Sequence, residues 1–303
     1  ASLSFKEKIH YNIFFSLGVD ETVDLSNMGL IMFDSLNADG TMDDAIAIYS
    51  GAVEMDGKYM VATDGVPAKY MGDTIYFRAY AKLADGSYVY SKTVQYSAVA
   101  YAEHILAGDE PESAKALVVA MLNYGAAAQM FFGYNTDNLV NAFLTDEQKA
   151  LPEQYRDDMA NTVPVVAAEK QGIFANNKGF NKRVPAVSFE GAFEINYFFT
   201  PAYAPVDGIT LYYWTEADFN AAEVLTVENA SGDLMMDGEG VGQYRGDVVG
   251  IAAKNLTEAV YVAAVYSDGT TTWTSGVLGY SIGAYCSSQA TKGGTIAELA
   301  MAT

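Results

Sequence analysis

The chain contains two copies of one sequence pattern. Residues 65–76 read GVPAKYMGDTIY, and residues 250–261, 185 positions later, read GIAAKNLTEAVY. The similarity extends in both directions, because Asn12 and Phe14 recur as Asn196 and Phe198. A repeat of this length predicts two units of the same architecture. Features that both copies keep are interpreted as scaffold, and features found in one copy only are candidates for function.

Each copy has the pattern of a β-sandwich. Residues 74–80 (TIYFRAY) alternate large and small side chains, and the Asp85-Gly86 pair leads into a second strand-like run over 87–94. Asp-Gly between two such runs is a strong signal for a hairpin, and Asp268-Gly269 repeats it. We therefore predict a fold that is mainly β with α: two tandem β-sandwich domains from an internal duplication, joined by a helical segment.

The segment between the copies has helical periodicity. Leu117, Met121, Tyr124 and Ala128 fall on one apolar stripe, which predicts a helix packed on a sandwich. We expect a first sandwich over 1–97, a helical segment over 98–166, a Gly- and Asn-rich connector over 167–183, and a second sandwich over 184–303. The last of these ends shortly after the capping box of Thr295 and Glu298, which predicts a truncated C-terminal helix.

Composition excludes several classes of function. With 38 acidic and 17 basic residues the net charge is −21, which disfavours nucleic acid and anionic membranes as partners. The only cysteine, Cys286, excludes an internal disulfide and a multi-cysteine zinc site. The longest apolar stretch, 114–132, is interpreted as too short and too polar for membrane insertion. The chain opens directly on a strand-like run, so we expect it to be a piece of a longer precursor.

Signals for catalysis are weak. His10 and His104 lie near no nucleophile motif, and neither G-x-S-x-G nor H-E-x-x-H is present. The sequence therefore predicts that the chain is not an enzyme. A glycoside hydrolase stays open as a third alternative, and it requires two carboxylates about 5–10 Å apart.

A loop rich in acids gives the only candidate for a cofactor. Residues 35–46 (SLNADGTMDDAI) carry Asn37, Asp39 and Asp43 at spacings that fit part of a calcium-binding loop. Ser35 and Ile46 occupy the first and last positions, where that loop requires acidic ligands. An acidic surface loop is the favoured interpretation. No cofactor is expected, and calcium is the alternative.

Aromatic residues are the most informative class for function, with 22 Tyr, 15 Phe and 2 Trp. Proteins bind sugars by placing an aromatic ring against an apolar C–H face of the sugar, with polar groups around it. The rings that both copies share are interpreted as core. Rings enlarged or present in one copy are candidate platforms, and single members of this set have core packing as their alternative. The predicted carbohydrate-binding residues are Tyr88 and Tyr90 in the first copy, and Tyr212, Trp214 and Trp273 in the second.

Two alignments support these candidates. Trp214 aligns with Phe33 and Trp273 with Tyr90, so each tryptophan replaces a smaller ring. Strict alternation places Tyr88 and Tyr90 on one face of a strand, and Tyr212 and Trp214 on one face of another.

Three segments carry a resemblance to a known family: GVPAKYMGDTIYFRAYAKLADGSYVYS, QYSAVAYAEHIL and ALVVAMLNYGAAAQMFFGYNTDNLVNAF. They resemble a duplicated repeat domain of clostridial and ruminococcal cell-surface proteins, and among these the starch-adherence (amylosome) carbohydrate-binding proteins. The resemblance covers nearly the whole chain. It implies a bacterial protein that is secreted or attached to the cell surface and is part of a larger multidomain protein. It also implies a polysaccharide or oligosaccharide partner, α-glucan in particular, and it transfers no binding residue by motif.

The favoured interpretation is a non-catalytic extracellular glycan-binding module that binds starch or malto-oligosaccharides through aromatic platforms. The alternative is a structural spacer or protein-interaction module of a cell-surface scaffold. Exposed rings favour binding, and buried rings favour the spacer.

Overall fold

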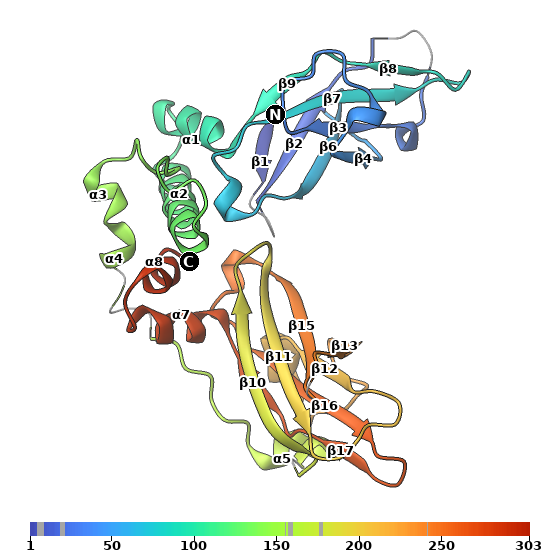
Figure 1. The fold of residues 1–303 in the computed structure, drawn as a ribbon, viewed down its shortest axis with the longest axis vertical. Coiled ribbons are helices and arrows are strands. Elements are labelled where there is room, and N and C mark those ends of the chain that lie inside the picture. Colours follow the sequence, from blue (N-terminus) through green and yellow to red (C-terminus); the bar gives the residue numbers. More distant parts are fainter. Residues whose placement is uncertain (5–8, 19–21, 155, 157–159, 176–177, 241) are drawn as a thin grey trace. The chain divides into compact units, whose positions relative to one another are not determined.

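The computed structural model describes residues 1–303 except 5–8, 19–21, 155, 157–159, 176–177 and 241. The chain divides into two compact units, Ala1–Ala150 and Leu151–Thr303 (Figure 1). Helices α1 and α2 of the predicted helical segment belong to the first unit, and the residues from 151 onward belong to the second.

The first unit contains two antiparallel sheets. One has the strand order β1-β2-β6-β5, and the other has the order β4-β3-β7-β8 with β9 also paired to β7. The strands are β1 (Ser2–Ser4), β2 (His10–Phe15), β3 (Met28–Phe33), β4 (Ala47–Ser50), β5 (Val53–Met55), β6 (Lys58–Gly65), β7 (Ile75–Lys82), β8 (Tyr88–Tyr90) and β9 (Val94–Tyr96). Short 3-10 helices are η1 (Leu25–Asn27), η2 (Met42–Asp44) and η3 (Ala68–Tyr70).

The second unit repeats this arrangement. Its sheets have the orders β10-β11-β15-β14 and β13-β12-β16-β17, with β18 paired to β16. The strands are β10 (Phe180–Ser188), β11 (Phe193–Pro201), β12 (Thr210–Trp214), β13 (Gly232–Met235), β14 (Asp237–Gly238), β15 (Tyr244–Ile251), β16 (Val260–Ser267), β17 (Thr272–Thr274) and β18 (Leu278–Tyr280). The helices are α4 (Leu151–Gln154), α5 (Ala168–Gln171), η5 (Gly172–Ala175), α6 (Glu216–Ala221), η6 (Ala253–Asn255), α7 (Ile282–Ala290) and α8 (Thr295–Ala302).

The strand order of the second unit is that of the first, element for element, so the predicted fold class of two duplicated sandwiches is confirmed. Hydrogen bonds outside the ladders repeat as well. The hydroxyl of Ser91 accepts from the N–H of Ala79 at 2.9 Å, and that of Ser275 accepts from Ala264 at the same distance. Duplication has therefore preserved the side-chain contacts that fix the hairpin ends as well as the strands.

The core of the first unit lies between its sheets. Alternate residues of β2 and β7 point inward, and Tyr11 meets Phe77 edge-on with ring centroids 6.0 Å apart. Ile13, Leu30 and Phe77 are all at most 4% exposed. The period of two that is visible in the sequence sets this face.

Two helices follow the first sandwich. Ser97 caps α1 (Ala98–Ala107) by accepting from the N–H of Ala100 at 3.0 Å, and α2 spans Glu112–Phe132. Gly125 of α2 packs on η3 and on the residue that follows it, because an added Cβ atom would lie 3.4 Å from the carbonyl oxygen of Ala68 and 3.0 Å from the sulfur of Met71. A short helix, α3 (Asp146–Lys149), ends this unit.

The polar residues of α2 have partners inside the fold. Asn123 donates to the carbonyl of Gln148 at 2.8 Å, and the side-chain oxygen of Gln129 accepts from the N–H of Val140 at 2.9 Å. With 21 residues and a mean hydropathy of 1.2, α2 is long and apolar enough to span a membrane. The expectation that this stretch is too short and too polar is therefore wrong on those two criteria. A core helix passes the same test, and half of the apolar stretch of α2 is buried within the structure.

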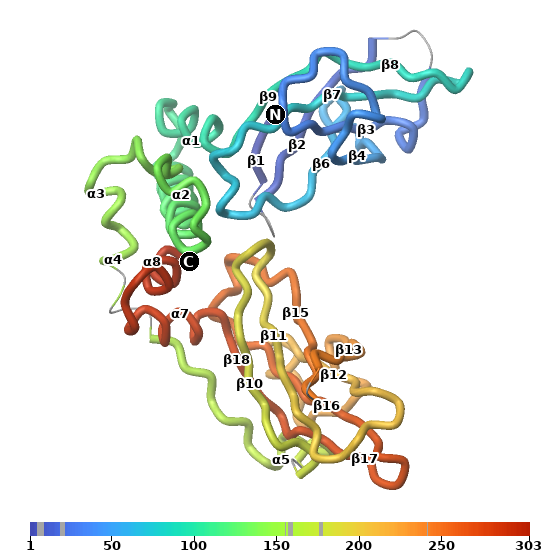
Figure 2. Tube along the Cα trace, in the orientation of Figure 1, coloured from blue at the N-terminus to red at the C-terminus, as the bar shows by residue number. Residues whose placement is uncertain are grey.

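In the second unit, residues 160–175 run along the sandwich and end in α5 and η5 (Figure 2). Phe174 of η5 is fully buried and packs with Val166 and Leu225 against the sheet that contains β12 and β16. The stretch predicted as connector, 167–183, thus supplies a core residue and the first residues of β10.

Candidate carbohydrate-binding surfaces

The outer face of the first unit carries a row of tyrosines, Tyr80, Tyr88 and Tyr90, which we call the tyrosine strip. Tyr88 and Tyr90 lie on β8, and Tyr90 pairs with Tyr80 of β7. The hairpin between β7 and β8 is fixed by Asp85, which accepts from the N–H and the hydroxyl of Ser87 at 2.9 and 2.6 Å. These two bonds hold the pKa of Asp85 below its ordinary value.

The rings of Tyr88 and Tyr90 are nearly parallel, with centroids 6.2 Å apart and an interplanar angle of 22°. This spacing follows the rise of roughly 6.6 Å over two strand residues. Tyr88 is 39% exposed and meets Tyr80 edge-on at 6.0 Å. Lys82 Nζ lies 5.9 Å from the ring centroid of Tyr88. Alternation does place Tyr88 and Tyr90 on one face, and a cation lies beside them.

A guanidinium group supports the inner end of the strip. Arg78 lies over the ring of Tyr90 at 5.0 Å and donates from Nε to the carbonyl of Ser91 at 2.8 Å. It also donates to the carbonyl of Gly40 at 2.6 Å. Cation–π contact and two hydrogen bonds restrict the orientation of both side chains, so the Tyr90 ring is preorganised.

The same contacts involve the loop considered for calcium. The carbonyl of Gly40 accepts from Arg78, and that of Asn37 accepts from the hydroxyl of Thr93 at 2.7 Å. Asp44 caps η2 by accepting from the N–H of Thr41 at 2.9 Å. These bonds use the main-chain oxygens of Asn37 and Gly40 and the carboxylate of Asp44, which are not the ligand groups of the calcium-binding pattern, so they do not test the calcium alternative. In the described part of the chain, no three His, Cys, Asp or Glu side chains are arranged to hold a metal.

Trp214 cannot be a surface platform, because it is fully buried. Its indole N–H donates to Asn229 at 3.0 Å, and Phe174 meets its ring edge-on at 5.3 Å. Tyr212 shares its face, as alternation predicted, and packs partly buried against the same cluster. The prediction of a Tyr212–Trp214 platform is therefore wrong. The sheet face that carries both rings is covered by residues distant in sequence, Val166, Phe174 and Leu225 among them.

Trp273 does not correspond to Tyr90. It pairs with Tyr266 of β16, whereas Tyr90 pairs with Tyr80, whose counterpart is Val265. The structural equivalent of Trp273 is Val89, and the two rings point to opposite faces of their sheets. A shift of one residue in an alignment reverses the face of every side chain in a strand, and here it invalidated the comparison.

Trp273 nevertheless takes part in a second aromatic surface. Tyr203 stacks on it with centroids 4.8 Å apart and an angle of 24°. The indole N–H donates to Asp268 at 2.8 Å, which is the main cause of the lowered pKa of that carboxyl. Tyr203 is 50% exposed and covers the half-buried tryptophan. Sequence comparison missed Tyr203, which lies in the connection between β11 and β12, where the copies differ in length.

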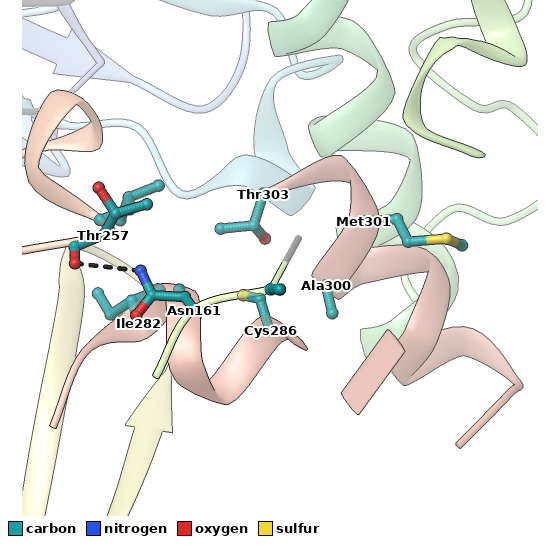
Figure 3. Close-up of a pocket in the computed structure, with 10 residues that line it drawn as sticks. Asn161, Thr257, Ile282, Cys286, Ala300, Met301 and Thr303 are labelled. Atoms are coloured by element: carbon teal, nitrogen blue, oxygen red, sulfur yellow. Dashed lines mark hydrogen bonds between the residues drawn. The ribbon is translucent and has the colours of Figure 1, made fainter. Parts of the chain in front are cut away.

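A cavity of about 210 Å³ lies in the second unit (Figure 3). It is lined by Cys286 of α7, by Ala300 and Met301 of α8, and by Asn161, whose amide donates to the carbonyl of Thr257 at 3.1 Å. Burial raises the pKa of Cys286 to about 12, so its thiol keeps its proton at neutral pH. A protonated thiol is a poor nucleophile, and this pocket offers an apolar wall rather than reactive groups.

Among the described residues, every carboxyl group with a clearly displaced pKa is displaced downwards. The causes are local hydrogen bonds at Asp24, Asp85, Glu147, Glu228 and Asp268, together with Arg156 at Glu153 and two hydroxyls at Asp218. The general acid of a glycosidase requires the opposite shift. None of these carboxyls has the environment that such an acid needs.

No protein-family model matches the chain, and no curated protein matches it in sequence. Among solved structures, the chain is similar to the crystal structure of a Br derivative of BhCBM56, a carbohydrate-binding module. The sequence identity is 12%, the match covers 34% of this chain and 98% of that chain, and the TM-score is 0.23. A similarity of this size does not identify a ligand for this chain.

Proposed function

We propose that the chain is a non-catalytic module that binds glycans through the tyrosine strip of the first unit. The observation that carries the proposal is the pair of nearly parallel rings at Tyr88 and Tyr90 on an outer sheet face, one of them 39% exposed. Ring faces supply apolar contact for sugar C–H groups at a low cost in entropy. Lys82 beside Tyr88 supplies donors for sugar hydroxyls.

The finer proposal is that the ligand is starch or another α-glucan, and it rests on the resemblance to starch-adherence proteins. A polymer whose sugar rings are regularly spaced suits the two aromatic rings of Tyr88 and Tyr90, which are spaced by the strand repeat. Localisation outside the bacterial cell and a place in a larger surface protein belong to the same proposal.

Affinity electrophoresis in native gels containing starch, xylan, cellulose or mucin tests both levels. We expect starch to retard the protein, and we expect Tyr88→Ala combined with Tyr90→Ala to reduce the retardation. Each lost ring should weaken binding by about 1–3 kcal/mol, by analogy with base stacking on aromatic side chains. If another polysaccharide retards the protein and starch does not, the starch proposal fails and the proposal of glycan binding stands.

The matched control is Tyr203→Ala, which removes an exposed ring of the second unit. Retention of starch binding in this variant, with loss in the strip variant, supports the assignment. Loss in Tyr203→Ala alone would move the site to the Tyr203–Trp273 surface. No retardation in any of the four gels would favour the spacer or protein-interaction module instead.

A further inference from the structure

The first unit contains an open cavity of about 670 Å³ where its two sheets meet. It is lined by the end of β3, by Tyr49 of β4, by Thr63 and Asp64 at the end of β6, and by the segment from η3 to Ile75. Pockets for small ligands typically measure about 300–1,000 Å³. This cavity is thus large enough for a small organic molecule and is distinct from the tyrosine strip.

The polar lining is specific to the first copy. Strand register gives the equivalents in the second copy, because Tyr49 pairs with Leu30 as Leu234 pairs with Leu211. In the same way, Tyr11, Tyr49, Thr63 and Asp64 correspond to Ile195, Leu234, Val248 and Val249. One scaffold therefore carries phenols, a hydroxyl and a carboxylate in one copy and aliphatic side chains in the other. Stability of the fold does not require the polar set.

Two of the lining side chains have fixed positions. Asp73 accepts a hydrogen bond from the hydroxyl of Tyr134 at 2.7 Å, and Tyr70 meets Tyr134 edge-on at 4.8 Å. The Nζ atom of Lys69, the residue before Tyr70, lies 5.1 Å from the centroid of the Tyr70 ring. A carboxylate and an aromatic ring are thus held together at the rim of the cavity, as preorganised recognition requires.

The buried wall supplies a donor. Tyr11 lines the cavity and is 1% exposed. Its hydroxyl makes no hydrogen bond of good geometry within the described part of the chain, although the N–H of Ala98 lies close enough to act on its pKa. Burial raises the pKa of Tyr11, and the charge of Asp73 raises it further, so the phenol is neutral and can donate. The hydroxyl oxygen is covered by protein atoms, so a ligand in the cavity reaches it when the ring shifts.

We infer that this cavity is a second binding site and that it takes a short neutral saccharide of one or two rings. Sugar hydroxyls donate and accept at once, which matches carboxylate acceptors at Asp64 and Asp73 together with a phenol donor at Tyr11. The rings of Tyr49 and Tyr70 provide apolar faces for the sugar. Among the described residues, the lining holds three carboxylates, Asp34, Asp64 and Asp73, and no Lys or Arg, which disfavours an anionic ligand. An ammonium group would offer the phenol no acceptor. The inference rests on the proposed function only in its choice of ligand class.

Isothermal titration calorimetry with glucose and maltose tests the site. The variants Asp64→Val and Tyr49→Leu introduce the residues of the second copy, and Asp64→Asn keeps the shape if either variant fails to fold. We expect maltose to bind the unchanged protein and each variant to bind about tenfold more weakly or worse, the loss expected for a hydrogen bond to a charged group. The variant lacking Tyr88 and Tyr90 should bind maltose normally while losing starch.

The failure of this inference is distinguishable from that of the strip. Starch retardation without any binding of glucose or maltose would overturn the cavity site and leave the strip intact. Unchanged maltose binding in Asp64→Asn, Asp64→Val and Tyr49→Leu would do the same. Tighter binding of glucosamine in its cationic form than of glucose would overturn the neutral ligand class.

Discussion

The two copies share one strand scaffold and differ in what covers the outer face of the sheet formed around β3 and β7 or around β12 and β16. In the first copy this face carries Tyr80, Tyr88 and Tyr90, with Met42 and Ala45 of the following loop packed beside Ile31 and Phe33. In the second copy Tyr212 and Trp214 occupy the positions of Ile31 and Phe33, and η5, α6 and Leu225 cover them. Both faces therefore contain a local core, with Tyr80 buried in the first copy and Trp214 in the second, and in the first copy Tyr88 at the edge of the face stays exposed.

The residues around the cavity between the sheets also differ, and here the first copy is the more polar of the two. Where the first copy has Tyr11, Thr63 and Asp64 around a cavity, the second has Ile195, Val248 and Val249. Ile195 and Val248 are buried and add hydrophobic burial, whereas Val249 is 61% exposed. A polar set between the sheets requires partners. The first copy thus concentrates the features that suit a ligand, and the second those that suit stability.

The largest expected effect tests whether the covered face is core. Trp214→Ala should lower the free energy of unfolding of the second unit by about 3–5 kcal/mol, because it leaves a cavity beneath Phe174 and Leu225. Denaturant unfolding measures this, and Trp273, the other tryptophan, remains as the fluorescence reporter. Trp273→Ala is the control and should cost less, since that ring is only half-buried. Equal costs would contradict the burial of Trp214.

An intermediate effect tests the equivalence of the hairpin serines. Ser275→Ala should destabilise by about 1–3 kcal/mol, because it leaves the buried N–H of Ala264 without an acceptor. Ser91→Ala removes the same bond to Ala79, but this bond is only part-buried because Ser91 itself is exposed, so water compensates for part of the loss. Urea unfolding of the two variants should therefore rank Ser275→Ala as the more damaging. A larger loss for Ser91→Ala would mean that the copies are not equivalent here.

The smallest effect concerns Cys286, whose counterpart on α1 is Ala102. The folded thiol has a pKa of about 12, above the ordinary value near 8.5 of an unfolded chain. Its contribution to stability is therefore complete below pH 8.5 and is lost as pH rises toward 12. Relative to Cys286→Ala, the unchanged protein should lose about 1–2 kcal/mol between pH 7 and pH 10. A constant difference in unfolding free energy across this range would show that the thiol is accessible to solvent.

Much of the fold was predictable, because strand signals are local. Alternation over 74–80 and the Asp85-Gly86 turn placed β7 and β8, and the repeat carried the prediction to β16 and β17. Alternation also placed Tyr88 with Tyr90, and Tyr212 with Trp214. These predictions succeeded because the period of a strand follows from its backbone geometry.

The site was less predictable, because accessibility depends on segments far away in the chain. Phe174 and Leu225 bury Trp214, and neither residue has a counterpart that an alignment of the two copies reveals. The alignment of Trp273 with Tyr90 was wrong because the hairpin loop of the second copy is shorter by one residue, which places Trp273 on the opposite face of its sheet. Tyr203 and the cavity around Tyr49 and Asp64 emerged only from the spatial arrangement.

The sequence by itself determined the duplication, the hairpins of β7 with β8 and of β16 with β17, and the residues that share a face, since all three follow from repeats and short-range periodicity. The tertiary structure decided which of those faces is open, which is covered and where the two sheets leave a cavity. The physical reason is that burial is a property of long-range packing: a strand fixes the direction of its side chains, and the segments that pack against it decide whether those side chains meet solvent, protein or a ligand.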